Sequence, residues 1–121
     1  MIINLTQHMA SKEQLALGVE DLHEDYRDKV KSLLTFADIP DSELVRSRAE
    51  RLAAIAFQIV FERGGNEAMI GGAPYLMGPL SACLKVLGIQ ALFAFSERVS
   101  QDGPDGEKVS VFKHRGWVKA Y

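Results

Sequence analysis

The feature that most constrains the fold is a strand–helix–strand pattern in the second half of the chain. Residues 67–71 (EAMIG) predict a buried strand, the apolar spacing over 76–87 predicts a helix, and 89–100 predict a second strand. Two parallel strands joined by a helix over about 30 residues are typical of a right-handed βαβ unit. Because proline disfavours a helix interior, we expect the helix to start close to Pro79.

The remaining segments predict one domain around this unit. Ser11 begins a short helix, because Gln14 three residues later completes a capping box, and Gly18 ends that helix. We therefore expect a small Rossmann-like three-layer α/β domain over residues 1–121, with a mostly parallel sheet of about four strands and an antiparallel C-terminal edge strand. The other predicted elements are a strand over 2–6, helices over 22–36 and 41–63, and the edge strand over 108–121.

The helix predicted over 41–63 is unusual because its second half is apolar on nearly every side. Residues 52–61 (LAAIAFQIVF) contain one polar side chain, Gln58. A helix that is apolar all round must be covered on more than one face. Two interpretations stay open: other elements cover this helix, or Phe57 and Phe61 contact a second copy of the protein.

Composition argues against several classes of function. Fourteen basic and sixteen acidic residues give a net charge of −2, without the basic face that duplex nucleic acid requires. Cys83 is the only cysteine, so we expect no intrachain disulfide and no thiolate zinc site, and its place on an apolar helix face predicts an inert core residue. The N-terminal residues lack a signal-peptide pattern, and no apolar run reaches the ~20 residues of a membrane span. We expect a cytoplasmic protein.

Candidate ligand-binding residues follow the predicted parallel strands. Ligands of open parallel sheets bind beyond the carboxyl ends of the strands. Gly71 and Gly72 leave room for a ligand beside the backbone, and the helix start after them offers free N–H groups to an anion. A tight turn that needs glycine only for its geometry is the alternative. The candidate ligand-binding residues are Asn4, Thr6, Gln7, His8, Gly71, Gly72, Ala73, Pro74, Tyr75, Ser96 and Arg98.

His8 is the candidate catalytic residue, because histidine transfers protons near neutral pH and also hydrogen-bonds bases and phosphates. An exposed histidine or a helix cap is the alternative. Tyr75 either stacks on a base or packs in the core. Lys113, His114 and Arg115 predict a solvated strand edge, because an antiparallel final strand carries them away from the strand ends. Neither a metal site nor a cofactor is predicted, since the three histidines lie far apart in the sequence.

Two segments carry a resemblance to known proteins. The segment IINLTQHMASKEQ resembles the opening of small CARF-like, ring-nuclease-like CRISPR-associated proteins, in which a strand ends in a polar segment with a histidine. The segment GGAPYLMGPLSACLKVLGIQALFAFSERVS is similar in plan to their later strand–helix–strand part, and NLTQH with MIGGAPYLM resembles uncharacterised phage and prophage proteins. The resemblance implies a dimeric Rossmann-like domain that binds a cyclic oligonucleotide or a related signal, with His8 and residues 71–75 as contacts.

Three functions remain open. The first is binding and sequestration of a nucleotide-derived signalling ligand, an anti-defence role in the host cytoplasm if a phage encodes the protein. The second is metal-independent hydrolysis of that ligand by a ring-nuclease-like phosphodiesterase, for which His8 is the only good proton donor or acceptor. The third is a protein–protein interaction or inhibitor role, with the apolar helix over 52–61 as the working surface.

Overall fold

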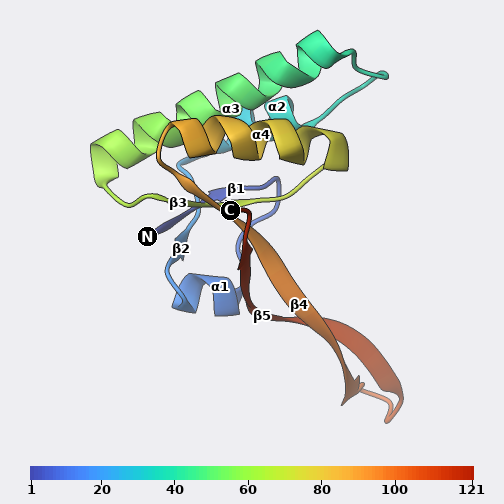
Figure 1. Ribbon diagram of the computed structural model, residues 1–121. Helices are drawn as coiled ribbons and strands as arrows, with labels where there is room; N and C mark the ends of the chain where they lie inside the picture. The colour runs from blue at the N-terminus through green and yellow to red at the C-terminus, as the bar shows by residue number, and fades with distance from the viewer.

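A five-stranded sheet forms the centre of the protein in the computed structural model, which describes residues 1–121 (Figure 1). The strands are β1 (Ile2–Leu5), β2 (Val19–Glu20), β3 (Glu67–Ile70), β4 (Gln90–Asp102) and β5 (Lys108–Lys119). Their order across the sheet is β2–β1–β3–β4–β5, with the first four parallel and β5 antiparallel to β4. The predicted mixed α/β domain with a mostly parallel sheet and an antiparallel C-terminal strand is confirmed.

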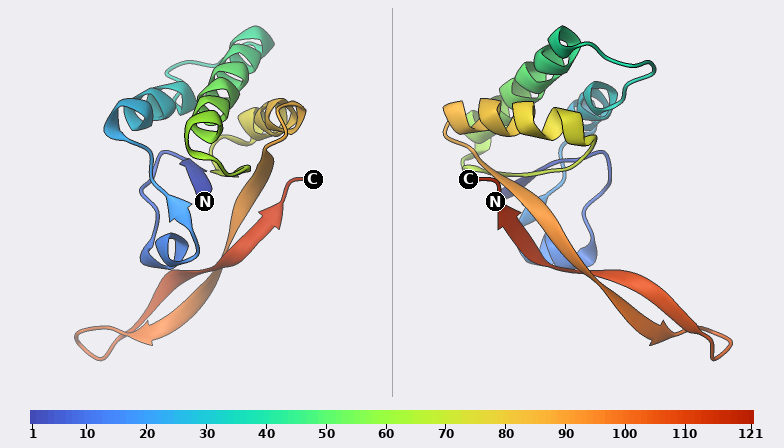
Figure 2. Two further views of the ribbon diagram at one scale, coloured as in Figure 1. Left: turned by 90° about the vertical axis from the view of Figure 1, so that its left-hand side faces the viewer. Right: turned by 45° about the vertical axis from the view of Figure 1, so that its right-hand side comes forward.

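The helices are α1 (Lys12–Ala16), α2 (Glu24–Leu34), α3 (Ser42–Arg63) and α4 (Pro74–Val86). The three longer helices cover one face of the sheet, and the five-residue α1 lies on the opposite face (Figures 1 and 2). The predicted capping box of α1 is present: the Ser11 hydroxyl accepts from the Gln14 N–H at 3.1 Å, and Gln14 Oε1 accepts from the Ser11 N–H at 3.0 Å. Each bond satisfies a donor that the helix start leaves open.

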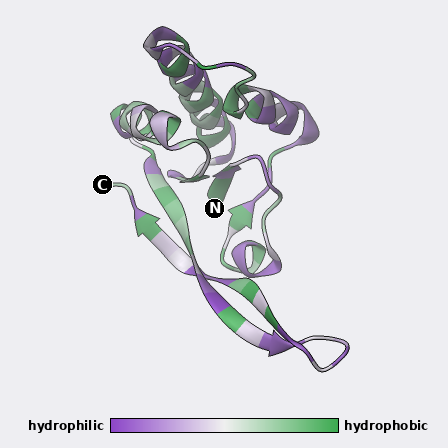
Figure 3. Ribbon diagram, turned by 90° about the vertical axis from the view of Figure 1, so that its right-hand side faces the viewer, coloured by the Kyte–Doolittle hydropathy of each residue, from purple (hydrophilic) through white to green (hydrophobic).

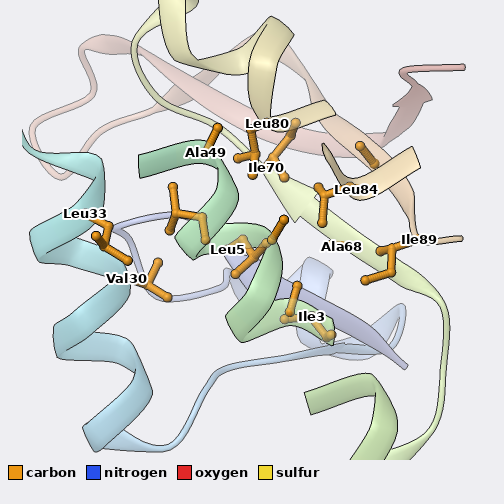
Figure 4. Packing of buried hydrophobic residues seen from close by; sticks show 14 of the residues in the cluster. Ile3, Leu5, Val30, Leu33, Ala49, Ala68, Ile70, Leu80, Leu84 and Ile89 are labelled. Atoms are coloured by element: carbon orange, nitrogen blue, oxygen red, sulfur yellow. The ribbon is translucent and has the colours of Figure 1, made fainter. Parts of the chain in front are cut away.

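The main hydrophobic core lies between the sheet and the three longer helices (Figure 4). Side chains alternate along a strand, so Ile3 and Leu5 of β1 enter this core while Ile2 enters a smaller cluster on the other face. That second cluster holds Ile2, Val19, Met69 and Leu92, with Trp117 packed against it. The two clusters explain why the short central strands are apolar at nearly every position.

Two sequence predictions need correction here. The sheet has five strands rather than four, because Val19–Glu20 adds a two-residue strand beside β1 that is too short to show a pattern. Helix α4 starts at Pro74 and contains Pro79, rather than starting near Pro79. Pro74 fits the first helical position, where no N–H is needed, and Pro79 follows early enough to remove only one bond near the helix start.

Other elements cover α3 on one side only, where Ala49, Leu52, Ala53, Ala56 and Ile59 are buried in the main core. Phe57 is half exposed, and Phe61 is 79% exposed. The buried side chains of this helix are mostly small, among them Ala49, Ala53 and Ala56, which let it pack closely on the layer below. The interpretation that other elements cover this helix therefore holds for one side of it but not for Phe57 and Phe61, whose contact with a second copy stays a prediction.

Strands β4 and β5 are 13 and 12 residues long, far longer than their neighbours, and they extend away from the rest of the protein as a two-stranded arm (Figure 2). The pairing shifts by one residue between Phe95 and Ser96, at a β-bulge. Such a bulge bends a strand and increases its twist. The helices offer no segment that is both long enough and apolar enough to span a membrane.

Candidate functional site

A hollow of about 400 Å³ opens at the carboxyl ends of β1 and β3, beside Phe93 and Ala94 in the first half of β4. The parallel register places Leu5 beside Ile70 and Ile70 beside Phe93, so the segments that follow β1 and β3 meet at one edge of the sheet while β4 continues past it. This is the edge at which open parallel sheets bind ligands. The hollow is lined by Thr6, Gln7, His8, Met9, Gln14, Met69, Ile70, Gly71, Gly72, Phe93 and Ala94.

Five of the sequence-predicted site residues meet in this hollow and six lie elsewhere. Thr6, Gln7, His8, Gly71 and Gly72 line it, from two segments more than sixty positions apart in the sequence. The predicted set of residues extended too far along the chain, because only the residues next to the end of a strand can line a hollow there. The predicted residues outside the lining are Asn4, Ala73, Pro74, Tyr75, Ser96 and Arg98.

Those six residues have other contacts. Tyr75 packs edge-to-face on Phe36, with ring centroids 5.5 Å apart, beside a different hollow. Ser96 lies on the arm opposite His114, and the Arg98 guanidinium lies 5.2 Å from the centroid of the Phe112 ring. Ala73 and Pro74 start α4 and carry no contact to the hollow.

Asn4 shapes the site without lining it. Its side chain is 5% exposed, and its amide nitrogen donates to Asp21 Oδ1 at 2.7 Å and to the His8 carbonyl at 2.9 Å. Its amide oxygen accepts from the N–H and the hydroxyl of Thr6, at 3.0 and 2.7 Å. Asp21 also accepts from the Ala10 N–H at 3.0 Å. These bonds fix the path of the backbone from residue 6 to residue 10, and with it the position of His8.

The walls of the hollow combine uncharged polar groups with apolar surface. His8 is the only titratable side chain among the lining residues, and no Lys, Arg, Asp or Glu lines the hollow. The imidazole of His8 is exposed and makes no hydrogen bond within the chain. The backbone N–H group of Gly72 also donates to no acceptor in the chain. One side of the hollow therefore presents hydrogen-bonding groups without a partner in the chain, and Met69 and Phe93 form an apolar wall.

The largest hollow in the protein, about 620 Å³, lies between α2 and α3 and is lined by Arg48 and Arg51 among others. Its arginine Arg48 donates to the carbonyls of Ser32, Leu33 and Thr35 at the end of α2, at 3.0, 3.0 and 2.8 Å. Cations at a helix C-terminus stabilise the helix. We therefore assign this hollow to the packing of α2 on α3 rather than to a ligand.

The prediction for His114 is the main one that the structure corrects near the site. The sequence predicted a solvated edge, but His114 is only 8% exposed and packs edge-to-face on Trp117 at 4.5 Å between ring centroids. It points to the same sheet face as α1, where its Nδ1 lies 3.4 Å from the side-chain nitrogen of Gln14. Burial lowers the pKa of His114, and the nearby Glu13 carboxylate opposes that effect in part. Gln14, which also lines the hollow, thereby ties β5 to the site.

Two buried nitrogen atoms beside this contact have no hydrogen-bond partner, Nε2 of His114 and Nε1 of Trp117. Because the Gln14 amide nitrogen can only donate, it requires an unprotonated Nδ1 and places the proton of neutral His114 on Nε2. The sequence signal for these residues is the two-residue alternation of β5 around its bulge, which puts His114 and Trp117 on one face. If the position of the bulge is not known, the same alternation places His114 and Trp117 on opposite faces of the sheet.

Comparisons with known proteins identify a family but no function. Neither a curated protein nor a solved structure matches this chain. The model of the uncharacterized protein MJ1673 family matches residues 1–118, almost the whole chain. The protein therefore belongs to the uncharacterized protein MJ1673 family.

Proposed function

We propose that this protein binds a small nucleotide-derived ligand in the hollow at the carboxyl ends of β1 and β3, beside β4, and that it sequesters a signal such as a cyclic oligonucleotide. The observation that carries the proposal is the meeting of Thr6, Gln7 and His8 with Gly71 and Gly72 around one hollow. Its volume of about 400 Å³ falls within the range typical of small-molecule sites. The proposal includes a Rossmann-like origin for the sheet, which shares with that fold the parallel strands and the ligand edge.

The chemistry of the walls favours one kind of nucleotide. A polyphosphate chain needs basic side chains or a metal ion to balance its charge, and no cation other than a protonated His8 lines the hollow. A phosphodiester carries one negative charge per linkage, which backbone N–H groups at the Gly72 turn and a histidine suffice to bind. The apolar wall at Met69 and Phe93 suits a base. A phosphodiester-linked ligand is therefore favoured over a nucleoside triphosphate.

A thermal-shift series tests this proposal. Nucleoside monophosphates and triphosphates, linear dinucleotides and cyclic di-, tri- and tetranucleotides are each added to the full chain. A ligand at 100 times its Kd stabilises the folded state by about 2.7 kcal/mol, which raises the Tm of a domain of this size by about 10 °C. We expect the shift with phosphodiester-linked ligands and not with triphosphates.

Three variants locate the binding site. Replacing His8 or Gln7 by Ala removes an exposed donor from the hollow and should weaken binding about tenfold, because one hydrogen bond to a charged group is lost. Arg98→Ala is the matched control, since Arg98 is exposed and lies on the arm. A panel without any shift contradicts the proposal, and so does a shift that Arg98→Ala abolishes while His8→Ala leaves it intact.

Hydrolysis of the bound ligand is the second candidate function. It rests on His8, the only side chain in the hollow that can exchange a proton near neutral pH. Product analysis by chromatography distinguishes it from sequestration. In the enzyme, His8→Gln should abolish turnover while the thermal shift persists, whereas unchanged ligand after incubation with the wild-type protein supports sequestration.

A protein–protein interaction is the third candidate, and the exposure of Phe57 and Phe61 on α3 favours it. Exposed aromatic side chains are enriched at interfaces. Under this proposal, Phe61→Ser removes binding to the partner and leaves every ligand shift unchanged, because α3 lies on the helical layer rather than at the hollow.

A further inference from the structure

The arm formed by β4 and β5 leaves apolar side chains in water. Phe112 is 71% exposed, Phe95 is more than half exposed, and Val109 is also exposed. Figure 3 shows hydrophobic bands along the ribbon of the arm, away from the helices. An isolated pair of strands is only marginally stable, and a third strand or a packed surface stabilises it. The arm therefore has the composition of a segment that gains stability from a partner.

The outer edge of β5 is open along its whole length. β5 is the last strand of the sheet, so its 12 residues have no neighbour on that side. The backbone N–H and C=O groups of such an edge readily pair with another strand. Lysines on an edge normally discourage that pairing, and β5 carries Lys108, Lys113 and Lys119. Only a partner strand that places suitable groups opposite these lysines fits the edge.

The segment 107–113 (EKVSVFK) is complementary to itself when two copies run antiparallel with Ser110 opposite Ser110. Val109 then faces Val111, and Lys108 faces the ring of Phe112. Glu107 faces Lys113 twice, once on each side of the two-fold axis. Directly opposed apolar pairs and opposite charges are the contacts that stabilise antiparallel strands.

Two of the three charged side chains on this segment, Glu107 and Lys113, are available for such a contact. Lys108 pairs within the arm with Asp102 at 2.7 Å, and Arg115 pairs with Glu97 at 2.6 Å. Glu107 and Lys113 make no ion pair within the chain. Arg98, Asp105 and Lys119 of the arm are also outside any ion pair, but only Glu107 and Lys113 lie in the segment that pairs in this register, and there they face each other.

The neighbouring registers lack this match. The outward backbone groups of an edge strand recur at every second residue, so the register changes in steps that keep like positions opposite. One step in one direction places Val109 opposite Lys113, and one step in the other places Glu107 opposite Val111. Each of these registers puts a charge against a valine.

We propose that β5 pairs antiparallel with β5 of a second copy of this chain, about Ser110, so that two sheets join through the ends of their arms. Ser110 lies near the tip of the arm, close to the loop that joins β4 to β5. The two bodies therefore lie at opposite ends of the joined arms and do not collide. The contact is short, and it belongs to the small interfaces that form and dissociate readily.

Sedimentation velocity of the full chain, from about 10 µM to 1 mM, measures this association. We expect a concentration-dependent monomer–dimer equilibrium that weakens as salt is added. Lys113→Glu puts Glu107 opposite a second carboxylate, and Glu107→Lys puts two ammonium groups together. Each variant changes two symmetry-related pairs and should weaken the dimer at least about tenfold. Circular dichroism checks that the exposed substitutions leave the fold intact.

The two single variants provide a positive test when they are mixed. One then carries only basic groups at positions 107 and 113 and the other only acidic groups, so each should bind the other about as tightly as the wild type binds itself. The variant with both substitutions should also recover self-association. Lys119→Glu is the control, because Lys119 lies at the far end of β5, outside the segment 107–113 that pairs in this register, and the change should leave the equilibrium unchanged.

Two results would overturn the proposal. One is a wild-type chain that stays monomeric throughout the concentration range. The other is a dimer whose Kd is the same in the wild type, in both single variants and in Lys119→Glu. If the charge variants leave the dimer unchanged but Phe61→Ser dissociates it, the two copies associate through the exposed face of α3 instead.

Discussion

Asn4→Asp tests how much of the site depends on one buried amide. The substitution keeps the shape of the side chain and replaces a nitrogen donor by a carboxylate oxygen. Two hydrogen bonds are lost, one to the carboxylate of Asp21 at 2.7 Å and one to the carbonyl of His8 at 2.9 Å. The first hydrogen bond contributes about 1.5–3 kcal/mol to the free energy of unfolding and the second about 1 kcal/mol. The new carboxylate also faces that of Asp21.

The expected loss is about 3 kcal/mol or more at pH 7.5, which lowers the Tm of a 121-residue domain by about 10–15 °C. Differential scanning calorimetry measures it. Two adjacent carboxyl groups share a proton when one becomes available. The folded variant therefore holds a proton that the unfolded chain releases, and the deficit should shrink as the pH falls from 7.5 toward 4.

Adding Asp21→Asn to Asn4→Asp reverses the direction of the hydrogen bond. The amide at position 21 donates to the carboxylate at position 4, and its oxygen still accepts from the Ala10 N–H. The double variant should recover most of the lost stability but not the bond to the His8 carbonyl. Asn66→Asp, an exposed position, controls for the added charge. A variant Asn4→Asp as stable as the wild type, or a deficit that Asp21→Asn does not reduce, refutes the reasoning.

Three further predictions follow from the structure. Burial lowers the pKa of His114, so the unfolded chain binds this proton more tightly than the folded one. Chemical denaturation should show stability rising with pH up to about 6.5 and then levelling, a trend that His114→Gln should reduce and that an equal slope in both proteins contradicts. Gly72→Ala should cost about 1–3 kcal/mol, because φ at Gly72 is +152° and the new Cβ lies 3.4 Å from a methionine methyl group. Gly71→Ala, whose Cβ makes an ordinary 3.5 Å contact without positive φ, should cost less than about 1 kcal/mol, and equal Tm losses refute the strain. Tyr121→Phe removes the hydroxyl that donates to the Ile89 carbonyl and should destabilise by about 1 kcal/mol in urea denaturation, whereas an unchanged midpoint excludes a role for that bond.

The sequence predicted the elements well because their signals are local. The capping box at Ser11, the long helix of α3 and the glycines at 71–72 each depend on residues within one or two turns. The meeting of residues 6–8 with 71–72 depends on the pairing of β1 with β3, which the rule for open parallel sheets anticipates without specifying strand order. Local signals therefore located the residues, and the pairing decided which of them meet.

The features of the site that the sequence did not predict depend on contacts between residues far apart in the chain. Gln14 and His114 meet from positions a hundred residues apart, and the meeting requires a bulge that no local pattern marks. Asn4 was predicted to contact ligand because it ends a strand, but the side chain alternation of β1 turns it toward Asp21 instead. Polar residues at strand ends thus divide into those that face a hollow and those that fix its backbone.

The order of the strands in the sheet has a consequence for synthesis on the ribosome. β1 emerges first, yet its partner β3 begins only at Glu67, and the walls contributed by Phe93 and Ala94 come later still. At about 5–20 residues per second, the apolar β1 waits between roughly 3 and 13 s for its neighbour. During this interval β2 is the only strand that can pair with β1, at Ile2 and Ile3. The N-terminal strand is therefore the part of the nascent chain that stays longest without its sheet partner, and the hollow is completed only when the last third of the protein has been made.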